Sequence, residues 1–523
     1  MVTAPPLAPT TPARPSAGTR PGPVVTATVA VLVAATFLPL GYVCWSVGSI
    51  GWQRAYQLVA RPRVGELLLN TVGLVVVTVP VCAVIGVGAA WLVERTDLPA
   101  QAIWRPVLVA PLAIPAFVNS YAWVSVVPSL HGLSAGMLVA TLSYFPLIYL
   151  PVAATLRRLD PAIEESARAL GSDSVGVFFR VVLPQLRLAM LGGALLIGVH
   201  LLAEYGAFAM LRFNTFTTAI FEQFQASFDG PAGSMLAALL VLCCLVMLVT
   251  EASARGRARW ARIGSGVPWP AAPIPLRGKS LAALAAVAGL AVLALGVPVW
   301  TMLRWLWTGG ADVWPLDDIG SALAQTVGLA TVAAVLTTVL AFPVAWVAVR
   351  SHGALARIVE GSNFITSSLP GIVTALALVT VSIRVAPPLY QTVVVLACAY
   401  VLMFIPRALV SVRAGLAQVP VTLEEASRSL GVSAAGTFAR VTVRLTAPAA
   451  AAGASLVFVA VATELTATLL LAPTGTRTLS MRFWSLASEL DYAAAAPYAL
   501  ILVLLSAPVT LLLYRQATKV AAL

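Results

Sequence analysis

The sequence predicts an all-α, polytopic membrane protein whose roughly twelve transmembrane helices form two parallel six-helix repeats. Three observations predict this fold: a composition poor in charge, a series of long apolar runs, and an internal repeat. The 523 residues are 60% hydrophobic and only 10% charged, whereas soluble domains carry about 25% charged residues. A chain of this composition is solvated largely by lipid, and membrane lipid is therefore its first expected partner.

Apolar runs of about 20 residues recur along the whole chain, and this length crosses a hydrocarbon core of about 30 Å as a helix. The runs are continuous and rich in Leu, Ala and Val, unlike the short alternating segments of a transmembrane β-barrel. The predicted spans are 24–47, 67–92, 104–127, 133–155, 188–210, 233–251, 280–303, 321–349, 360–383, 388–412, 447–471 and 493–514.

The N-terminal residues 1–23 are rich in Pro, Ala and Thr and cannot build a core, so the sequence predicts a disordered tail there. With this tail in the cytoplasm, the cytoplasmic segments hold 24 of the 32 Lys and Arg residues, as the positive-inside rule requires. We therefore expect both termini in the cytoplasm. The same rule explains the net charge of +12, so no nucleic-acid partner is expected.

An internal repeat divides the chain into two halves. Matches at an offset of 255 are Thr71 with Thr326, Trp91 with Trp346, Arg95 with Arg350, Pro115 with Pro370 and Pro151 with Pro406. After five inserted residues, the matches at an offset of 260 are Glu165 with Glu425, Gly171 with Gly431, Arg180 with Arg440, Glu204 with Glu464 and Thr218 with Thr478. Six spans return the chain to its starting side, so the halves share one orientation, as in parallel repeats related by an axis along the membrane normal. The predicted units are a first repeat (24–252), a cytoplasmic linker (253–279) and a second repeat (280–523).

The most polar part of the repeat occurs at Ile163–Pro184 and again at Leu423–Arg444. Each copy has a proline near its start, acidic residues in the first turn, and a stop at Gly171 or Gly431. This pattern predicts a short, capped helix on the cytoplasmic side. A single copy would be explained equally well by a connecting loop, but two matching copies favour a helix that docks in a groove of another protein.

These two passages resemble the E-A-A motif of the membrane subunits of ABC importers, in which a glycine follows after three residues. In the second copy, Arg444 stands where the motif has its final proline. The resemblance implies two coupling helices, each held in a cleft of one of two ATPase subunits. The residues to which it assigns ATPase coupling are Glu164, Glu165, Ala167, Gly171, Glu424, Glu425, Ala426 and Gly431.

The chain itself shows no ATPase site. A P-loop needs G-x-x-x-x-G-K-[ST] between a strand and a helix, whereas the sequence before Gly278-Lys279-Ser280 has Pro273 at the first glycine position and a membrane span follows. We therefore expect no catalytic residue and no bound cofactor in this chain, with ATP and magnesium used by the partner ATPase.

Ionisable residues within the fifth predicted span of each half are of interest, because a charge inside the membrane costs about 2.5–3.5 kcal/mol on insertion scales and indicates a function. Glu204 and Glu464 occupy the fifth span of each half, and His200 lies one turn before Glu204, within reach of a hydrogen bond. We assign these three residues to the translocation pathway. The alternative is that each glutamate ties neighbouring helices together by hydrogen bonds; we do not expect them to ligate a resident metal.

The segments 201–224 and 462–484, together with Arg95–Pro99 and the duplication in one chain, resemble the fused iron(III) permeases of this importer class. The resemblance implies a bacterial inner-membrane protein that imports ferric iron from an external binding protein, which would dock on loops within 48–65, 211–232 and 473–492. Similar permeases import thiamine, phosphonates or polyamines. A proton-driven secondary transporter is the alternative from another class, but it gives no reason for paired cytoplasmic helices.

Overall fold

The computed structural model describes residues 22–225, 230–255, 273–351 and 353–522. Within these residues the secondary structure is helical, apart from one isolated bridge between Thr96 and Ile274. The described residues contain nine helices that could cross a membrane by length and composition, or twelve if each of three bent helix pairs is one span. This confirms the predicted all-α, polytopic fold. Most of the predicted disordered tail and most of the predicted linker lie outside the described residues, and the first helix, α1 (Pro23–Thr36), begins at the last residue of the predicted tail.

The first repeat begins with α1 (Pro23–Thr36) and α2 (Leu38–Ile50), which are bent by 44° relative to each other. It continues with α3 (Trp52–Val59), α4 (Pro62–Arg95), α5 (Gln101–Val107), η1 (Ala110–Ala113), α6 (Ala116–Val126), α7 (Gly132–Tyr144), α8 (Pro146–Leu156), α9 (Pro161–Ala169), α10 (Ser174–Val177), η2 (Phe178–Val182), α11 (Leu183–Ala203), α12 (Gly206–Met210), α13 (Phe216–Gln225) and α14 (Gly230–Arg255).

The second repeat follows the same order. It consists of η3 (Arg277–Lys279), α15 (Ser280–Ala291), η4 (Val292–Gly296), α16 (Val297–Gly309), α17 (Leu316–Arg350), α18 (Ala354–Thr366), α19 (Gly371–Val385), η5 (Pro387–Leu389), α20 (Val393–Ala417), α21 (Val421–Ser429), α22 (Ala434–Thr437), η6 (Phe438–Thr442), α23 (Val443–Ala462), α24 (Thr466–Leu471), α25 (Leu479–Ser488) and α26 (Tyr492–Ala522).

The predicted straight spans 104–127 and 360–383 are each broken at a matched proline. The chain bends by 93° between Gln101–Ala113 and α6, and by 104° between α18 and α19. Pro115 precedes α6 and Pro370 precedes α19, each with extended backbone. Proline lacks an amide hydrogen and forces the preceding residue out of the helical region, so it ends one helix before the next begins.

The two predicted fifth spans, 188–210 and 447–471, also end early. The long helix α11 stops at Ala203 and α23 stops at Ala462, so the glutamates stand in breaks rather than inside the spans. In each break the carboxylate accepts a hydrogen bond from the first turn of the following short helix, at Ala207 in one repeat and at Ala467 in the other. A carboxylate placed before a helix satisfies amides that have no partner within the helix and favours starting a new one there.

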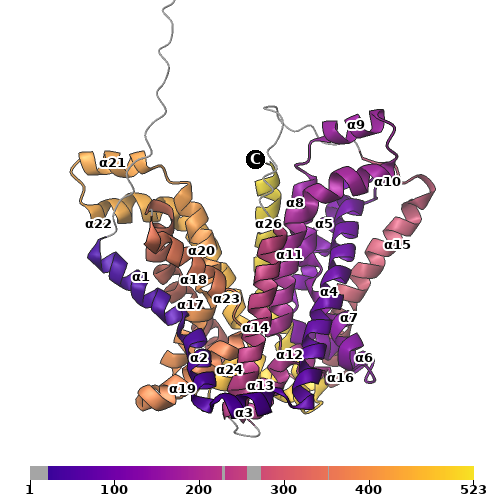
Figure 1. Cartoon of the computed structure of the whole chain (residues 1–523). Coiled ribbons are helices and arrows are strands. Elements are labelled where there is room, and N and C mark those ends of the chain that lie inside the picture. The colour runs from indigo at the N-terminus through magenta and orange to yellow at the C-terminus, as the bar shows by residue number, and fades with distance from the viewer. Residues whose placement is uncertain (1–21, 226–229, 256–272, 352, 523) are drawn as a thin grey trace, which may run out of the picture.

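The first span of each repeat packs against the other repeat. Helix α1 of the first repeat contacts α17 and α18 of the second repeat, and its Val29 is buried among residues of the second repeat. Conversely, Val287 of α15 and Ala294 of η4 are buried in the core of the first repeat. Figure 1 shows this exchange, with α1 beside the orange helices of the second repeat and α15 beside the indigo and magenta helices of the first.

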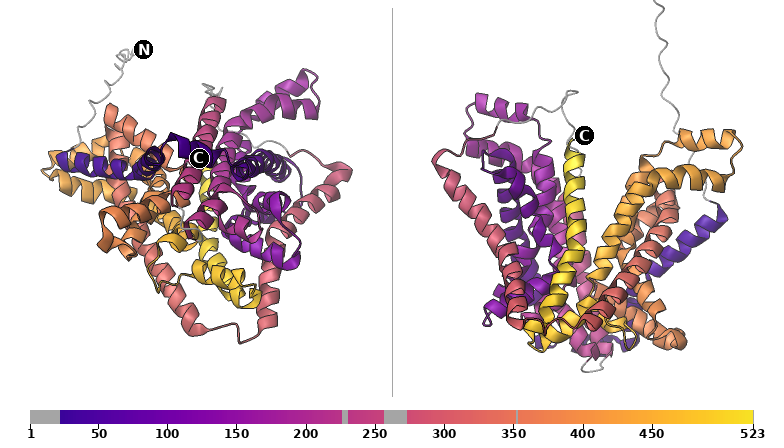
Figure 2. Two further views of the ribbon diagram at one scale, coloured as in Figure 1. Left: turned by 60° about the horizontal axis from the view of Figure 1, so that its bottom comes forward. Right: turned by 180° about the vertical axis from the view of Figure 1, so that it is seen from behind.

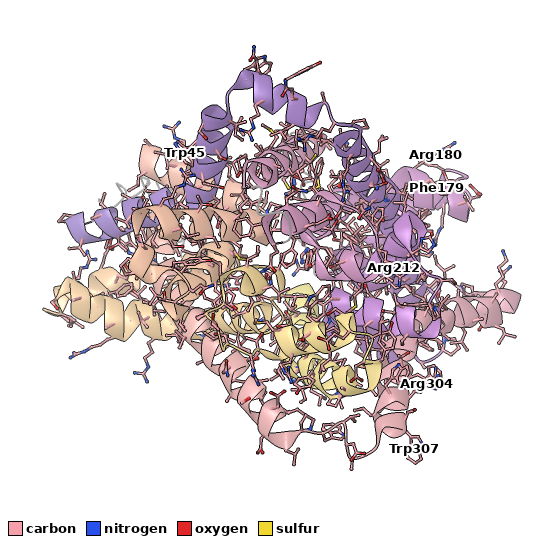
Figure 3. All side chains as sticks on the ribbon, turned by 90° about the horizontal axis from the view of Figure 1, so that it is seen from below. Trp45, Phe179, Arg180, Arg212, Arg304 and Trp307 are labelled. Atoms are coloured by element: carbon pink, nitrogen blue, oxygen red, sulfur yellow. The ribbon has the colours of Figure 1, made fainter. Side chains whose placement is uncertain are left out.

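The two repeats form two arms that converge at one end of the molecule and diverge toward the other (Figures 1 and 2). We call the end that carries α9 and α21 the coupling end; α26 also ends there (Figure 1). We call the convergent end, formed by α12, α13, α24 and α25, the junction end. Viewed from this end, Trp45 and Trp307 lie at the periphery (Figure 3), with exposed fractions of 50% and 90%, as expected of tryptophans at a membrane–water interface.

Candidate functional site

The two predicted coupling helices, α9 and α21, are short helices at the same end of the molecule (Figure 1). Asp160 caps the start of α9 by accepting a hydrogen bond from the Ala162 amide at 3.0 Å, with Pro161 in the first turn. Both helices end at a glycine in the left-handed region, Gly171 at φ +90° and Gly431 at φ +81°. These observations confirm the predicted helices and their glycine stops.

The replacement of the motif proline by Arg444 leaves the geometry after α21 unchanged. In both repeats a second short helix, α10 or α22, follows the coupling helix and continues into a five-residue π-helical turn, η2 or η6. Each turn runs directly into the next long helix, α11 or α23. Arg444 is exposed at the start of α23, where proline would be tolerated but is not required.

The first glutamate of each coupling helix points back into its own chain. Arg95, at the end of α4, donates to Glu164 Oε1 at 2.7 Å, and both side chains are less than 10% exposed. Arg350, at the end of α17, donates to Glu424 Oε1 at 3.2 Å and to the Val419 carbonyl at 2.6 Å. The sequence repeat had matched the two arginines without revealing their partners. These ion pairs fasten each coupling helix to a membrane-spanning helix.

The opposite face of each coupling helix is open to solvent. Glu165, Glu425 and Ala426 are exposed, while Ala167 is half-buried. Sequence reasoning missed the leucine that stands directly before each glycine stop. Leu170 and Leu430 are 87% and 83% exposed, and equivalent apolar side chains held outward at both copies are typical of a surface that binds another protein. The shared Leu-Gly pair was the signal that could have identified them.

A second pair of matched residues connects the long helices to the junction end. In the first repeat, the Thr71 hydroxyl of α4 accepts a hydrogen bond from the Phe216 amide, at the start of α13. In the second repeat, the Thr326 hydroxyl of α17 accepts one from the Leu479 amide, at the start of α25. Each long helix therefore contacts both a coupling helix and a short junction helix.

These contacts correct one part of the sequence repeat. The hydroxyls of Thr215 and Thr217 lie 2.9 Å apart at the start of α13, and those of Thr478 and Ser480 lie 3.4 Å apart at the start of α25. The prediction that Thr218 matches Thr478 is therefore wrong, because Thr478 takes the place of Thr215. The second repeat has gained residues between its glutamate and its last short helix, and an offset read from the chain cannot detect this insertion.

Hydrogen bonds fix both junction glutamates in place. Glu204 accepts from the Ala207 amide through Oε1 and from the Tyr144 hydroxyl through Oε2, both at 3.0 Å. Glu464 accepts from the Ala467 amide at 2.8 Å through Oε1. Their backbone carbonyls accept from the neighbouring hydroxyls, Thr217 at 2.6 Å and Ser480 at 2.9 Å, respectively. The structure thus shows hydrogen bonds of the helix-tying kind at both positions.

His200 is placed differently from the prediction. Its Nδ1 atom lies 2.7 Å from the Leu196 carbonyl, and its ring packs against Tyr144 with centroids 5.3 Å apart. The expected hydrogen bond to Glu204 is wrong, because α11 ends before that glutamate and its carboxylate turns toward α12 and Tyr144. Among the described residues, no group of three or more His, Cys, Asp or Glu side chains is arranged to hold a metal ion.

The two repeats touch at the junction end. A Cβ atom added to Gly206 would lie 2.8 Å from Leu465 of the other repeat and 2.9 Å from Phe117. The close approach of the Gly206 backbone to these two side chains requires glycine. It places α12 and α24, and the glutamates that precede them, where the two arms meet. The arrangement combines two outward-facing helices at one end with paired carboxylates where the arms meet.

Comparisons with known proteins match both repeats. The family described as the binding-protein-dependent transport system inner membrane component matches residues 58–259 and 337–521. An Fe(3+)-transport system permease protein of Haemophilus influenzae is 35% identical over 486 residues, which cover 92% of this chain and 96% of that protein. Sulfate transport system permease proteins of Synechocystis and Salmonella typhimurium are 28% and 26% identical, over 42% and 40% of this chain and 87% and 83% of their own length.

Proposed function

Because this chain belongs to the family of binding-protein-dependent transport system inner membrane components, we propose that it carries ferric iron into the cell. It is a multi-pass membrane protein and the permease subunit of an ABC importer of the bacterial inner membrane, a class that works with an ATPase and an external binding protein. One observation supports the cargo. The iron(III) permease of Haemophilus influenzae is similar along 92% of the chain, whereas the sulfate permeases of Synechocystis and Salmonella typhimurium each match less than half of it.

The proposed partners on the cytoplasmic side are two ATPase subunits, one at each coupling helix. The outward face of each helix offers a glutamate, Glu165 or Glu425, and a leucine, Leu170 or Leu430. A charge beside an exposed apolar side chain suits a polar-rimmed cleft with an apolar floor. The coupling end then lies in the cytoplasm with both termini, and the external binding protein docks on the opposite end.

The long helices α4 and α17 transmit motion between the two ends. Each ion pair holds a coupling helix to one end of a long helix, and each threonine holds a junction helix nearer its other end. With 34 residues in α4 and 35 in α17, each helix is about 50 Å long at 1.5 Å per residue. Closing two ATPases on ATP would draw the coupling ends together and separate the junction helices, which opens the path outward. Hydrolysis would restore the arrangement seen here.

The proposed translocation pathway passes the junction, where Glu204, Glu464 and His200 lie. Carboxylate oxygens are hard ligands that attract a hard, highly charged cation. Because each carboxylate is also held by a helix amide, the glutamates combine a structural role with a negative lining of the path.

Uptake of radiolabelled ferric iron tests the proposal in cells that express the importer with or without this chain. We expect uptake that needs the chain and ATP, and that is lost in Glu165→Lys and Glu425→Lys while both variants still reach the membrane. Labelled sulfate, thiamine, phosphonate and a polyamine measured in parallel test other cargoes. Uptake of one of these in place of iron would overturn the cargo. Uptake that persists without ATP but stops with an uncoupler would indicate a secondary transporter.

A further inference from the structure

An open groove lies between α4 and α11, beside the turn η2 that leads from the coupling end into α11. Its volume is about 370 Å³, and small-molecule sites in proteins usually measure about 300–1,000 Å³. The side chains that form it are mostly apolar and include Ala83 of α4, Phe179 of η2, and Leu183, Met190, Leu191 and Ala194 of α11. Both α4 and the segment Val175–Ala203 can cross a membrane by length and composition, so a ligand of this groove reaches it from the membrane.

The groove faces away from the proposed translocation pathway. Leu191 in the groove and His200 near the junction are nine residues apart in α11, which is two and a half turns at about 3.6 residues per turn. They therefore lie on opposite sides of the helix. At the edge of the groove, Phe179 is 59% exposed, and it lies with Arg180 at the periphery of the molecule (Figure 3). The exposed apolar surface at this groove is thus turned toward lipid.

One cation interrupts the apolar lining of the groove. Arg187 of α11 forms part of the wall and is exposed. Its Nη2 atom donates to the Ala254 carbonyl at 2.6 Å, in the last turn of α14, so the guanidinium extends toward the coupling end. Among the described residues this is its one hydrogen bond, and no carboxylate lies within 4.0 Å of its nitrogens. A guanidinium has five N–H donors, so most of them remain for another acceptor.

An apolar groove with a guanidinium at the membrane boundary suits an anionic phospholipid. A phosphate accepts paired hydrogen bonds from a guanidinium, and basic pockets between transmembrane helices bind anionic headgroups. Arg180, which directly follows Phe179, is also exposed and has no carboxylate within 4.0 Å among the described residues. It adds a second positive charge beside the groove. A lipid without net charge would gain less, because the cation of its own headgroup is repelled.

The second repeat lacks the residues that make this site. At the positions matched to Arg187, Met190 and Leu191 by the offset of 260, three small side chains stand, Ala447, Ala450 and Ala451. None of them can bind a phosphate, and they offer less apolar surface to an acyl chain. We therefore expect one such site in the chain, in the first repeat.

We propose that the groove between α4 and α11 binds one anionic phospholipid from the leaflet at the coupling end. Arg187 holds the phosphate, and an acyl chain lies along the apolar wall of α11 and against Phe179. Because η2 connects this groove to the segment that carries the coupling helix α9, the bound lipid fastens that side of the first arm to the surrounding leaflet. The site is separate from the proposed pathway, so this inference does not depend on the cargo.

Native mass spectrometry of the purified full chain in detergent tests this inference, with dioleoyl phosphatidylglycerol and dioleoyl phosphatidylcholine as probes that share the same acyl chains. We expect the wild type to retain one phosphatidylglycerol in preference to phosphatidylcholine. Arg187→Gln should weaken phosphatidylglycerol binding at least about tenfold, because hydrogen bonds between charged groups are the strong ones. Arg187→Lys should keep most of the preference, and Met190→Trp, which fills the groove, should weaken both lipids. Arg440→Gln removes the exposed arginine matched to Arg180 in the second repeat and is the control, with no expected change.

Three outcomes would overturn the lipid site: equal retention of the two lipids by the wild type, equal phosphatidylglycerol affinity in the wild type and Arg187→Gln, or a loss in Arg440→Gln as large as that in Arg187→Gln. Displacement of the lipid by glycerol 3-phosphate, which has the phosphate but no acyl chain, would indicate a simple anion site instead. Because Arg187→Gln also loses the hydrogen bond to Ala254, its unfolding temperature is measured without added lipid. Phe179→Ala, at an exposed position, tests the groove without changing that bond and should weaken both lipids.

Discussion

At the coupling end, the two repeats form the same buried ion pair, whereas at the junction the hydrogen bonds to the side chains of their glutamates differ. Arg95 with Glu164 and Arg350 with Glu424 form matching ion pairs between a long helix and a short one. Around Glu204 and Glu464, by contrast, the helix amide and the hydroxyl that donates to the backbone carbonyl are shared, but only Glu204 accepts a hydrogen bond from a tyrosine. This difference indicates which contacts must stay the same in both repeats and which are free to diverge. Two identical partners would require two identical docking helices, but a single solute that passes between the arms meets both repeats at once and needs no symmetry.

The largest expected effect comes from breaking the matched ion pairs. Arg95→Ala and Arg350→Ala each remove the arginine nearest to a buried glutamate, although Arg168 still lies 3.8 Å from Glu164, and breaking a buried pair costs about 3–5 kcal/mol. We expect both variants to show a clearly lower unfolding temperature in detergent and at least a tenfold loss of uptake. Arg413→Ala is the matched control, because its pair with Glu360 is nearly half exposed on both sides and such pairs contribute at most about 1 kcal/mol. If only one of the two buried pairs mattered, the coupling ends would not be equivalent.

The glycine stops give the next largest effect. Alanine at Gly171 or Gly431 would meet no atom within 4 Å, so its cost is conformational only, about 1–2 kcal/mol for a side chain in the left-handed region. We expect Gly171→Ala and Gly431→Ala to weaken ATPase binding equally, as measured by co-purification. Gly361→Ala is the control, since that position also has open space but lies inside α18 without a positive φ. Unequal losses would indicate that the two ATPase contacts differ.

At the junction, we expect equivalent substitutions in the two repeats to reduce stability unequally. Tyr144→Phe removes a hydrogen bond to the carboxylate of Glu204, and bonds to charged groups contribute about 1.5–3 kcal/mol. Tyr400→Phe removes a bond to the neutral hydroxyl of Thr468 at 2.8 Å, for which about 0.5–1.5 kcal/mol is expected. The unfolding temperature should therefore fall further in Tyr144→Phe than in Tyr400→Phe. Equal losses of stability would mean that the two hydrogen bonds contribute equally, although their sequences differ.

The sequence predicted the features that depend on local pattern. Apolar runs predicted the spans, and acidic residues in the first turn with a glycine at the end predicted the coupling helices and their ends at Gly171 and Gly431. It could not show that Pro115 and Pro370 break spans, since a proline inside an apolar run is compatible with a kinked helix as well. Nor could it show which way Glu164 points, because a salt bridge to Arg95 depends on the packing of segments that are distant in sequence.

The smallest effect concerns an ion pair whose polarity is reversed between the repeats. Arg63, before the membrane part of α4, pairs with Glu222 of α13 at 2.9 Å, with both side chains more than half exposed. At the matched position of α17 stands Asp318, which binds Arg482 of α25 at 2.7 Å and is 18% exposed. We expect Glu222→Gln to change the unfolding free energy by close to zero and Asp318→Asn by about 1 kcal/mol, since exposure and salt weaken the first pair more. Unfolding measured at low and high salt distinguishes the two pairs. A salt-dependent loss of stability in Glu222→Gln as large as that in Asp318→Asn would show that the two pairs stabilise their repeats equally. The asymmetry of the repeats would then be confined to the residues around Glu204 and Glu464.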